Sequence, residues 1–190
     1  YGDPNTVIER CVVHGTSAAA AIYLYDYSYN SDAVSLTVRD STIIDGSWGI
    51  RTAVTSSSSR SPDQRVTLTN NTIDGANYGI YAAGRGSTSS HFIIYNNVLI
   101  NNGWAFYFNG KGNMSNDYNL YYGNSSRFSG SATGGANRIT SDPGLSADTP
   151  PVPTAGGSAD GAGHSSYNTG SDYWTNPRSS PPSIGAVEPH

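Results

Sequence analysis

The sequence predicts an all-β protein whose short parallel strands coil into a solenoid of about five rungs, a rung being one turn of the coil. Three observations predict this fold. Helix-favouring residues are scarce, because the 190 residues include one Met, one Lys and two Glu against 14 Tyr. Alternating apolar and polar stretches lie between turn residues, as expected of short strands. These stretches repeat with a period of 20 to 30 residues.

The repeat is clearest in three segments of eleven residues that align without gaps. They cover residues 40–50, 70–80 and 96–106, and each follows an alternating strand. A looser copy begins at Arg10 and a degenerate fifth copy at Asn116. Because stacked rungs place equivalent residues in columns, we expect two core columns. One column holds Ile43, Ile73 and Leu99, and the other holds Ile22, Ile50, Ile80 and Phe106.

A polar column lies beside the first core column. Asn71 and Asn97 occupy equivalent positions, and Ser41 and Cys11 stand there in the two earlier copies. Stacked amides hydrogen-bond along the coil and satisfy buried turn backbone. We interpret this column as a structural ladder with no catalytic role.

Short sequence signatures indicate the superfamily that the chain resembles. An apolar strand is followed by Asn-Asn-x-Ile at 70–73 and by Gly-Ile at 79–80, and residues 116–122, 141–145 and 182–188 are similar to the last rung and closing segment of many secreted bacterial members. On these motifs the chain resembles the right-handed parallel β-helix superfamily, the fold of pectin and alginate lyases and of many secreted repeat proteins. The resemblance covers essentially the whole chain and implies a secreted or cell-surface location. It leaves the activity open, because this superfamily hosts lyases, hydrolases, epimerases and non-catalytic domains.

We expect one domain made of two parts, β-helix rungs over residues 1–123 and an irregular segment, rich in Pro, Gly and Ser, over residues 124–190. The last 50 residues have no repeat and are expected to wrap the final rung as its cap. Members of the superfamily usually begin with an N-terminal cap, and residues 1–9 are too short to supply one. We therefore expect that further rungs precede Tyr1 or that another copy stacks on the first rung.

Composition excludes several function classes. The net charge of −4 and the pI of about 5.4 provide no basic stripe for nucleic acid. No apolar run approaches the ~20 residues of a membrane span. The single Cys11 excludes an internal disulfide framework.

Aromatic residues recur in two further columns. Trp48, Tyr78 and Trp104 share one column, and the residue that follows each inward Ile or Phe forms the second, which should face outward. Two interpretations of the second column remain open. Aromatic faces and an Arg could stack on sugar rings and bind hydroxyls, or they could stabilise the sheet, pack beneath loops or meet another subunit. The candidate glycan-binding residues are Tyr23, Arg51, Tyr81 and Tyr107, with Tyr25 on the same side of its strand as Tyr23, Tyr27 and Tyr29.

Catalytic candidates are few. Lyases of this fold typically use a Lys, Arg or His base, with acidic residues holding Ca²⁺ in several families. Here Arg51 is the best-placed cation, and Lys111 lies in a Gly-rich turn. Acidic residues such as Asp45 and Asp74 fall out of register, so we expect no cofactor, and Ca²⁺ is the one metal ion left open. We therefore expect no catalysis by this chain itself.

Three sequons provide candidate glycosylation sites, at Asn70, Asn113 and Asn124. Asn70 lies at a rung turn, where we expect its side chain to point outward.

Together these features predict an extracellular β-solenoid that interacts with a polysaccharide or serves a structural role. Two alternatives stay open. The chain could be a subunit of a self-assembling fibre or adhesin, because residues 1–9 are too short to cap the first rung. It could also be a polysaccharide lyase acting on an acidic glycan, or the C-terminal part of one.

Overall fold

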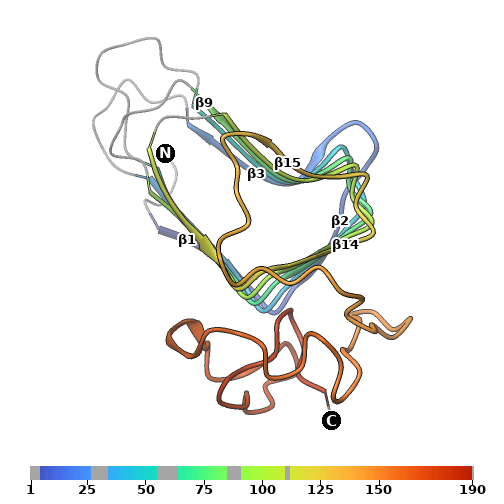
Figure 1. The fold of residues 1–190 in the computed structure, drawn as a ribbon. Coiled ribbons are helices and arrows are strands. Elements are labelled where there is room, and N and C mark those ends of the chain that lie inside the picture. Colours follow the sequence, from blue (N-terminus) through green and yellow to red (C-terminus); the bar gives the residue numbers. More distant parts are fainter. Residues whose placement is uncertain (1–4, 27–33, 55–63, 85–90, 110–111, 190) are drawn as a thin grey trace.

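The structure is a computed structural model, and the residues described here are 5–26, 34–54, 64–84, 91–109 and 112–189. They form 15 strands in three parallel sheets of five strands each, and one short 3₁₀ helix, η1 (Ser165–Tyr167). Each rung contributes one strand to each sheet, so the chain climbs through five stacked rungs (Figure 1). The prediction of a parallel β-helix of about five rungs is confirmed. Within this part of the chain, no helix is long and apolar enough to cross a membrane.

The three sheets are named in the order in which the chain first meets them. The first sheet consists of β1 (Asn5–Glu9), β4 (Val34–Arg39), β7 (Gln64–Thr69), β10 (His91–Tyr95) and β13 (Asn113–Asp117). The second sheet consists of β2 (Val12–His14), β5 (Thr42–Ile44), β8 (Thr72–Asp74), β11 (Val98–Ile100) and β14 (Leu120–Tyr122). The third sheet consists of β3 (Ala20–Asp26), β6 (Trp48–Val54), β9 (Tyr78–Gly84), β12 (Trp104–Asn109) and β15 (Ser126–Gly130).

Both predicted core columns lie in the interior. Ile73 pairs with Ile43 on one side and with Leu99 on the other, and all three side chains are fully buried. The second column is in register in the third sheet, where the chain buries Ile22, Ile50, Ile80 and Phe106. Burial of each such side chain stabilises the coil by roughly 1.5–3 kcal/mol.

The corner between the first and second sheets is made by residues in the left-handed conformation. Each rung has one, with φ between 50° and 58°. Asn and Asp adopt this conformation more readily than other residues with a side chain, which explains why they recur there. These corner residues are Arg10, Asp40, Asn70, Asn96 and Tyr118.

The fifth repeat begins two residues later than the sequence predicts. Tyr118, rather than Asn116, takes the left-handed corner with φ of 54°. Consequently Leu99 pairs with Tyr121, whose ring is fully buried at the end of the first core column. The predicted start at Asn116 is therefore wrong, because an unusual corner residue hides the equivalence.

The predicted amide ladder is present and runs one rung further. Nδ2 of Asn71 donates to Oδ1 of Asn97 at 3.0 Å, and Nδ2 of Asn97 donates to Oδ1 of Asn119 at 2.9 Å. Backbone groups join the ladder, since Ser41 N donates to Oδ1 of Asn71 at 3.1 Å. Asn102 and Asn124 form a second, shorter ladder at the next corner, with Nδ2 and Oδ1 3.0 Å apart.

The fifth rung is covered by the segment that follows it. Strand pairing continues past residue 123, because β15 pairs with β12 in the third sheet. The chain then crosses the end of the coil (Figure 1), where Ala132 packs against the core and Asn116 donates to the carbonyl of Thr133. Ile139 finally bridges to Leu120 at the edge of the second sheet.

The rest of the C-terminal segment does not cap the last rung, contrary to expectation. Residues 164–178, here called the strap, lie beside the coil (Figure 1) and run back along the corner residues toward the first rung. His164 N donates to Oδ1 of Asn96 at 2.7 Å, and Nδ2 of Asn70 donates to Tyr167 O at 2.9 Å. Further along, the strap contacts the two earliest corner residues: Thr169 donates to Asp40 at 2.7 Å, and Arg10 donates to Ser171 at 3.4 Å. The polar corner column thus binds the strap.

A buried ion network fastens the strap to the coil. Arg178 is fully buried and contacts Asp40 at 2.8 Å and Glu188 at 3.1 Å. Its guanidinium also donates to the carbonyls of Gly185 and Ala186, each at 3.0 Å. Burial raises the pKa of Asp40 above its ordinary value, although Arg178 opposes that shift.

Candidate functional site

The predicted aromatic columns lie side by side on the third sheet. Trp48 pairs with Tyr78, which pairs in turn with Trp104. The second column is likewise in register across four rungs, with Tyr23, Arg51, Tyr81 and Tyr107 in successive strands. The two columns touch, since the rings of Tyr78 and Tyr81 meet edge to face with centroids 5.2 Å apart.

The Arg51 guanidinium is enclosed by rings. Its central carbon lies 4.3 Å from the Trp48 ring centroid and 4.8 Å from that of Tyr23. Such cation–π contacts contribute roughly 0.5–1 kcal/mol each at half-exposed sites. Among the described residues, the Nε of Arg51 and the Nε1 of Trp48 are buried and have no hydrogen-bond partner. The structure therefore places Arg51 inside the aromatic cluster.

The rings of Tyr81 and Tyr107 stack face to face. Their rings are parallel within 5° at 4.6 Å, so each ring covers one face of its neighbour. Burial, assisted by the neighbouring Tyr107, raises the pKa of Tyr81. Tyr23 and Tyr25 at the edge of the sheet are more open, at 44% and 48% exposure. The binding role predicted for these residues stays a prediction.

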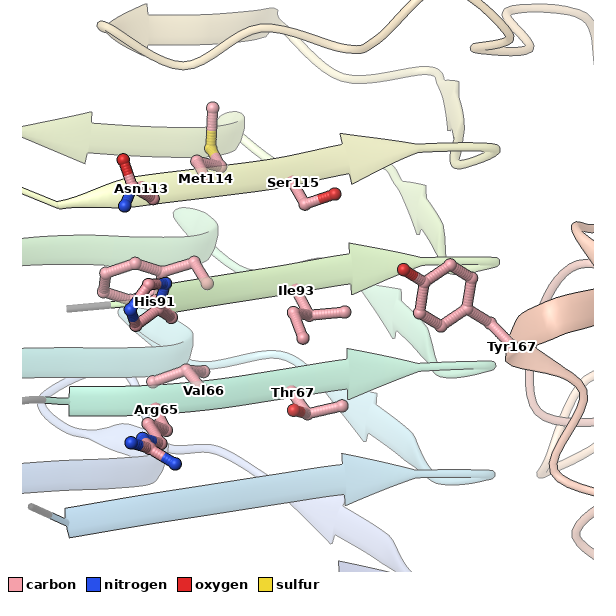
Figure 2. Close-up of a pocket in the computed structure, with 10 residues that line it drawn as sticks. Arg65, Val66, Thr67, His91, Ile93, Asn113, Met114, Ser115 and Tyr167 are labelled. Carbon is pink, nitrogen blue, oxygen red and sulfur yellow. The ribbon is translucent and has the colours of Figure 1, made fainter. Parts of the chain in front are cut away.

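A groove on the outer face of the first sheet was not predicted. It has a volume of about 630 Å³ and lies across β7, β10 and β13 (Figure 2). Side chains from three adjacent rungs form its floor, and a residue of the strap forms a wall at one end. The lining residues are Arg65, Val66, Thr67, His91, Phe92, Ile93, Asn113, Met114, Ser115 and Tyr167.

Tyr167 is the wall that the strap contributes. Its ring stacks on Tyr95 at 3.9 Å with an interplanar angle of 20°, and Figure 2 shows its hydroxyl end facing the groove. The corner amides hold the backbone, because Asn70 donates to Tyr167 O and Asn96 donates to His164 O at 3.2 Å. Burial, together with the neighbouring Tyr95, raises the pKa of Tyr167.

The groove floor contains two aligned rows of side chains. Arg65, His91 and Asn113 align in adjacent strands, one above another in Figure 2. A second aligned row consists of Thr67, Ile93 and Ser115. The first row carries hydrogen-bond donors and a positive charge, whereas the second row places an apolar side chain between two hydroxyls.

The remaining candidate residues are the catalytic and metal-binding ones and the other tyrosines of the first rung. Lys111 lies outside the described residues, as do Tyr27 and Tyr29, so their assignments stay predictions. Asp45 and Asp74 lie at neighbouring corners, with Asp45 N donating to Asp74 O at 2.8 Å. Across the described ranges, no group of three His, Cys, Asp or Glu side chains could hold a metal ion.

The three sequons differ in accessibility. The side chain of Asn70 reaches out of the coil to Tyr167 O, and the strap that covers it leaves Asn70 fully buried. Asn124 belongs to the second ladder and donates to Leu99 O at 2.8 Å. Asn113 is exposed, on the groove floor.

A comparison with protein families identifies the fold family. Residues 1–99, about half of the chain, match the family described as "Right handed beta helix region". The chain belongs to the right-handed β-helix family. The comparisons with curated proteins and with solved structures gave no match. Membership in this family agrees with the observed fold. It does not determine the function, which depends on the surfaces of this β-helix.

The residues of the groove left only a partial signal in the sequence. Arg65 and His91 each precede an inward residue of the β-helix by one position, so alternation alone places both on the outer face. Tyr167 had no such signal. It belongs to the irregular strap, whose position depends on contacts with residues about 70 to 100 positions earlier.

Proposed function

We propose that this β-helix is an extracellular glycan-binding domain that holds a segment of a polysaccharide chain in the groove of the first sheet. The observation that carries the proposal is the groove itself, an open trough whose floor combines polar and apolar side chains and is bounded by the Tyr167 ring. Sugar-binding sites combine an aromatic surface for the apolar face of a ring with donors and acceptors for its hydroxyls. This groove supplies both.

The geometry of the sheet also suits an extended chain. Parallel strands lie about 4.8 Å apart, which is close to the length of one sugar unit in an extended polysaccharide. A polysaccharide chain lying across the strands would meet one residue of each floor row on every rung. Thr67 and Ser115 would supply hydroxyl contacts on either side of Ile93.

The third sheet is the alternative glycan surface. Its rings are engaged with one another and with Arg51, whereas the groove offers an open volume lined by both polar and apolar side chains. That difference favours the groove as the principal binding site.

Affinity electrophoresis against a panel of neutral and acidic polysaccharides tests the proposal. At least one polymer should retard the wild-type protein, and Tyr167→Ala and Ile93→Ala should each restore most of the free mobility. Tyr81→Ala on the third sheet serves as the matched control and should remain retarded. Retention that survives both groove variants and is lost in Tyr81→Ala would assign the glycan to the aromatic face. No retardation by any polymer would refute glycan binding.

Self-association at the first rung is a second candidate function. Val7, Tyr23 and Tyr25 on the edge strands β1 and β3 are 55%, 44% and 48% exposed. Unpaired strand edges with exposed apolar side chains are templates for further pairing. Val7→Lys should then abolish an assembly seen by sedimentation equilibrium, and a monomer at every concentration would contradict it.

A further inference from the structure

The charge of the groove bears on the kind of glycan that it takes. This inference rests on the proposed function, since it concerns the ligand of the same groove. None of the ten described residues that line the groove is acidic, although the chain as a whole has a net charge of −4. The groove is therefore an electropositive site on an acidic protein.

Arg65 supplies the positive charge. It is exposed on the floor, and it takes part in none of the ion pairs found among the described residues. Other arginines on or near this face differ, because Arg39 and Arg10 both pair with Glu9. An arginine without an acidic partner retains all five of its donors for a ligand.

The neighbours of Arg65 extend the donor set. His91 is its aligned partner in the next strand, and Asn113 is aligned with His91 one rung further. The three side chains thus stand in adjacent strands, about 4.8 Å from one to the next. The guanidinium fork binds carboxylate and sulfate oxygens in a bidentate way, and the imidazole and amide N–H groups can share the same anion.

We propose that the groove selects glycans that carry anionic groups, with a carboxylate or sulfate seated over Arg65, His91 and Asn113. The uncharged part of the sugar then lies over Ile93, toward Tyr167. The charged row and the aromatic wall lie on opposite sides of the groove (Figure 2), so a glycan segment that fills the groove can contact both. Uronic acids and sulfated sugars share this chemistry.

Paired probes separate charge from polymer shape. Polygalacturonate and its fully methyl-esterified form share a backbone and differ in carboxylate charge, and dextran sulfate and dextran differ likewise in sulfate. The wild-type protein should bind at least one charged member about ten-fold more tightly than its neutral partner. The charged member that binds identifies the carboxylate or the sulfate as the recognised group.

Arg65→Gln should remove most of that preference while leaving binding of the neutral member within about two-fold. Arg65→Lys keeps the charge and loses the fork, so it should fall between wild type and Arg65→Gln. Arg127→Gln on the third sheet removes the same charge from an exposed position and should leave the preference intact. Circular dichroism should show all three variants folded.

The outcomes distinguish this inference from the proposed function. Equal affinity for charged and neutral partners, with binding still lost in Tyr167→Ala, would overturn anion selection and preserve glycan binding. A preference that Arg127→Gln reduces as strongly as Arg65→Gln would also overturn it, because the attraction would then come from net charge alone. Absence of binding to every polymer would overturn both.

Discussion

Removal of the Arg178 side chain should weaken the attachment of the strap to the coil and lower the stability of the protein. In Arg178→Met a residue of similar length keeps most of the packing and loses the charge. The Oδ1 of Asp40 then keeps Thr169 as its hydrogen-bond donor, and Glu188 keeps the backbone N–H of Ser183 at 2.9 Å. Both carboxylates remain buried without a cation.

The expected decrease in stability follows from the loss of the Arg178 cation. Breaking a buried ion pair by removing one partner costs about 3–5 kcal/mol, because an uncompensated charge stays inside. With an m value of about 3 kcal/mol/M in urea, the unfolding midpoint should fall by about 1–1.7 M. Arg127→Met at an exposed position is the matched control and should shift the midpoint by about 0.2 M or less.

The effect should depend on pH in a defined direction. Burial raises the folded-state pKa of Asp40 above its unfolded-state value, and removal of Arg178 raises that pKa further. Protonation of Asp40 stabilises the folded state fully at a pH below the unfolded-state pKa. This stabilisation is lost as the pH rises through the folded-state pKa. The destabilisation measured for Arg178→Met should therefore be smaller near pH 4 than near pH 8.

Urea titration followed by tyrosine and tryptophan fluorescence measures both effects. An unchanged midpoint, or a destabilisation that grows as the pH falls, would refute the assignment of Arg178 as the cation that holds the strap. A lower midpoint with strap and coil unfolding in one transition would show that the corner column couples them.

Three further results are expected. Asn97→Ala should lower the free energy of unfolding by about 2–4 kcal/mol, because it leaves buried carbonyls and amides of the ladder unpaired, whereas Asn77→Ala at an exposed position should cost under about 1 kcal/mol in the same urea titration. Expression in a host that attaches N-glycans should modify Asn113 and leave Asn70 unmodified, as peptide mass spectrometry would show; a glycan on folded protein at Asn70 would contradict the buried corner. Tyr81→Ala should lower stability by about 2–4 kcal/mol, through lost ring packing, without changing glycan affinity, and a stable variant with weakened binding would contradict the structural role of the stack.

The coil could be predicted because every rung repeats the same local chemistry. Ile43, Ile73 and Leu99 fall in register wherever the period is kept, and Asn or Asp at a left-handed corner marks most repeat boundaries. The boundary of the fifth repeat was predicted at the wrong residue, because Tyr118 adopts the left-handed conformation without being Asn or Asp. Periodicity alone therefore placed the last rung two residues too early.

The strap and the groove could not be predicted in the same way. Arg178 and Asp40 meet although 138 positions separate them, and neither residue belongs to a periodic pattern that would pair them. Tyr167 reaches the first sheet only because the strap follows the corner column. The groove is shared by a repeat and a non-repetitive segment, and the wall that the segment supplies, Tyr167, has no sequence signal.

The location of a bound glycan tests the central claim most directly. Hydrogen–deuterium exchange, measured with and without a saturating oligosaccharide of the polymer that binds, reports which backbone amides the ligand protects. We expect slower exchange across residues 65–67, 91–95, 113–115 and 164–167, where β7, β10, β13 and η1 border the groove. Protection confined to β9 and β12 would place the ligand on the aromatic face of the third sheet and contradict the account.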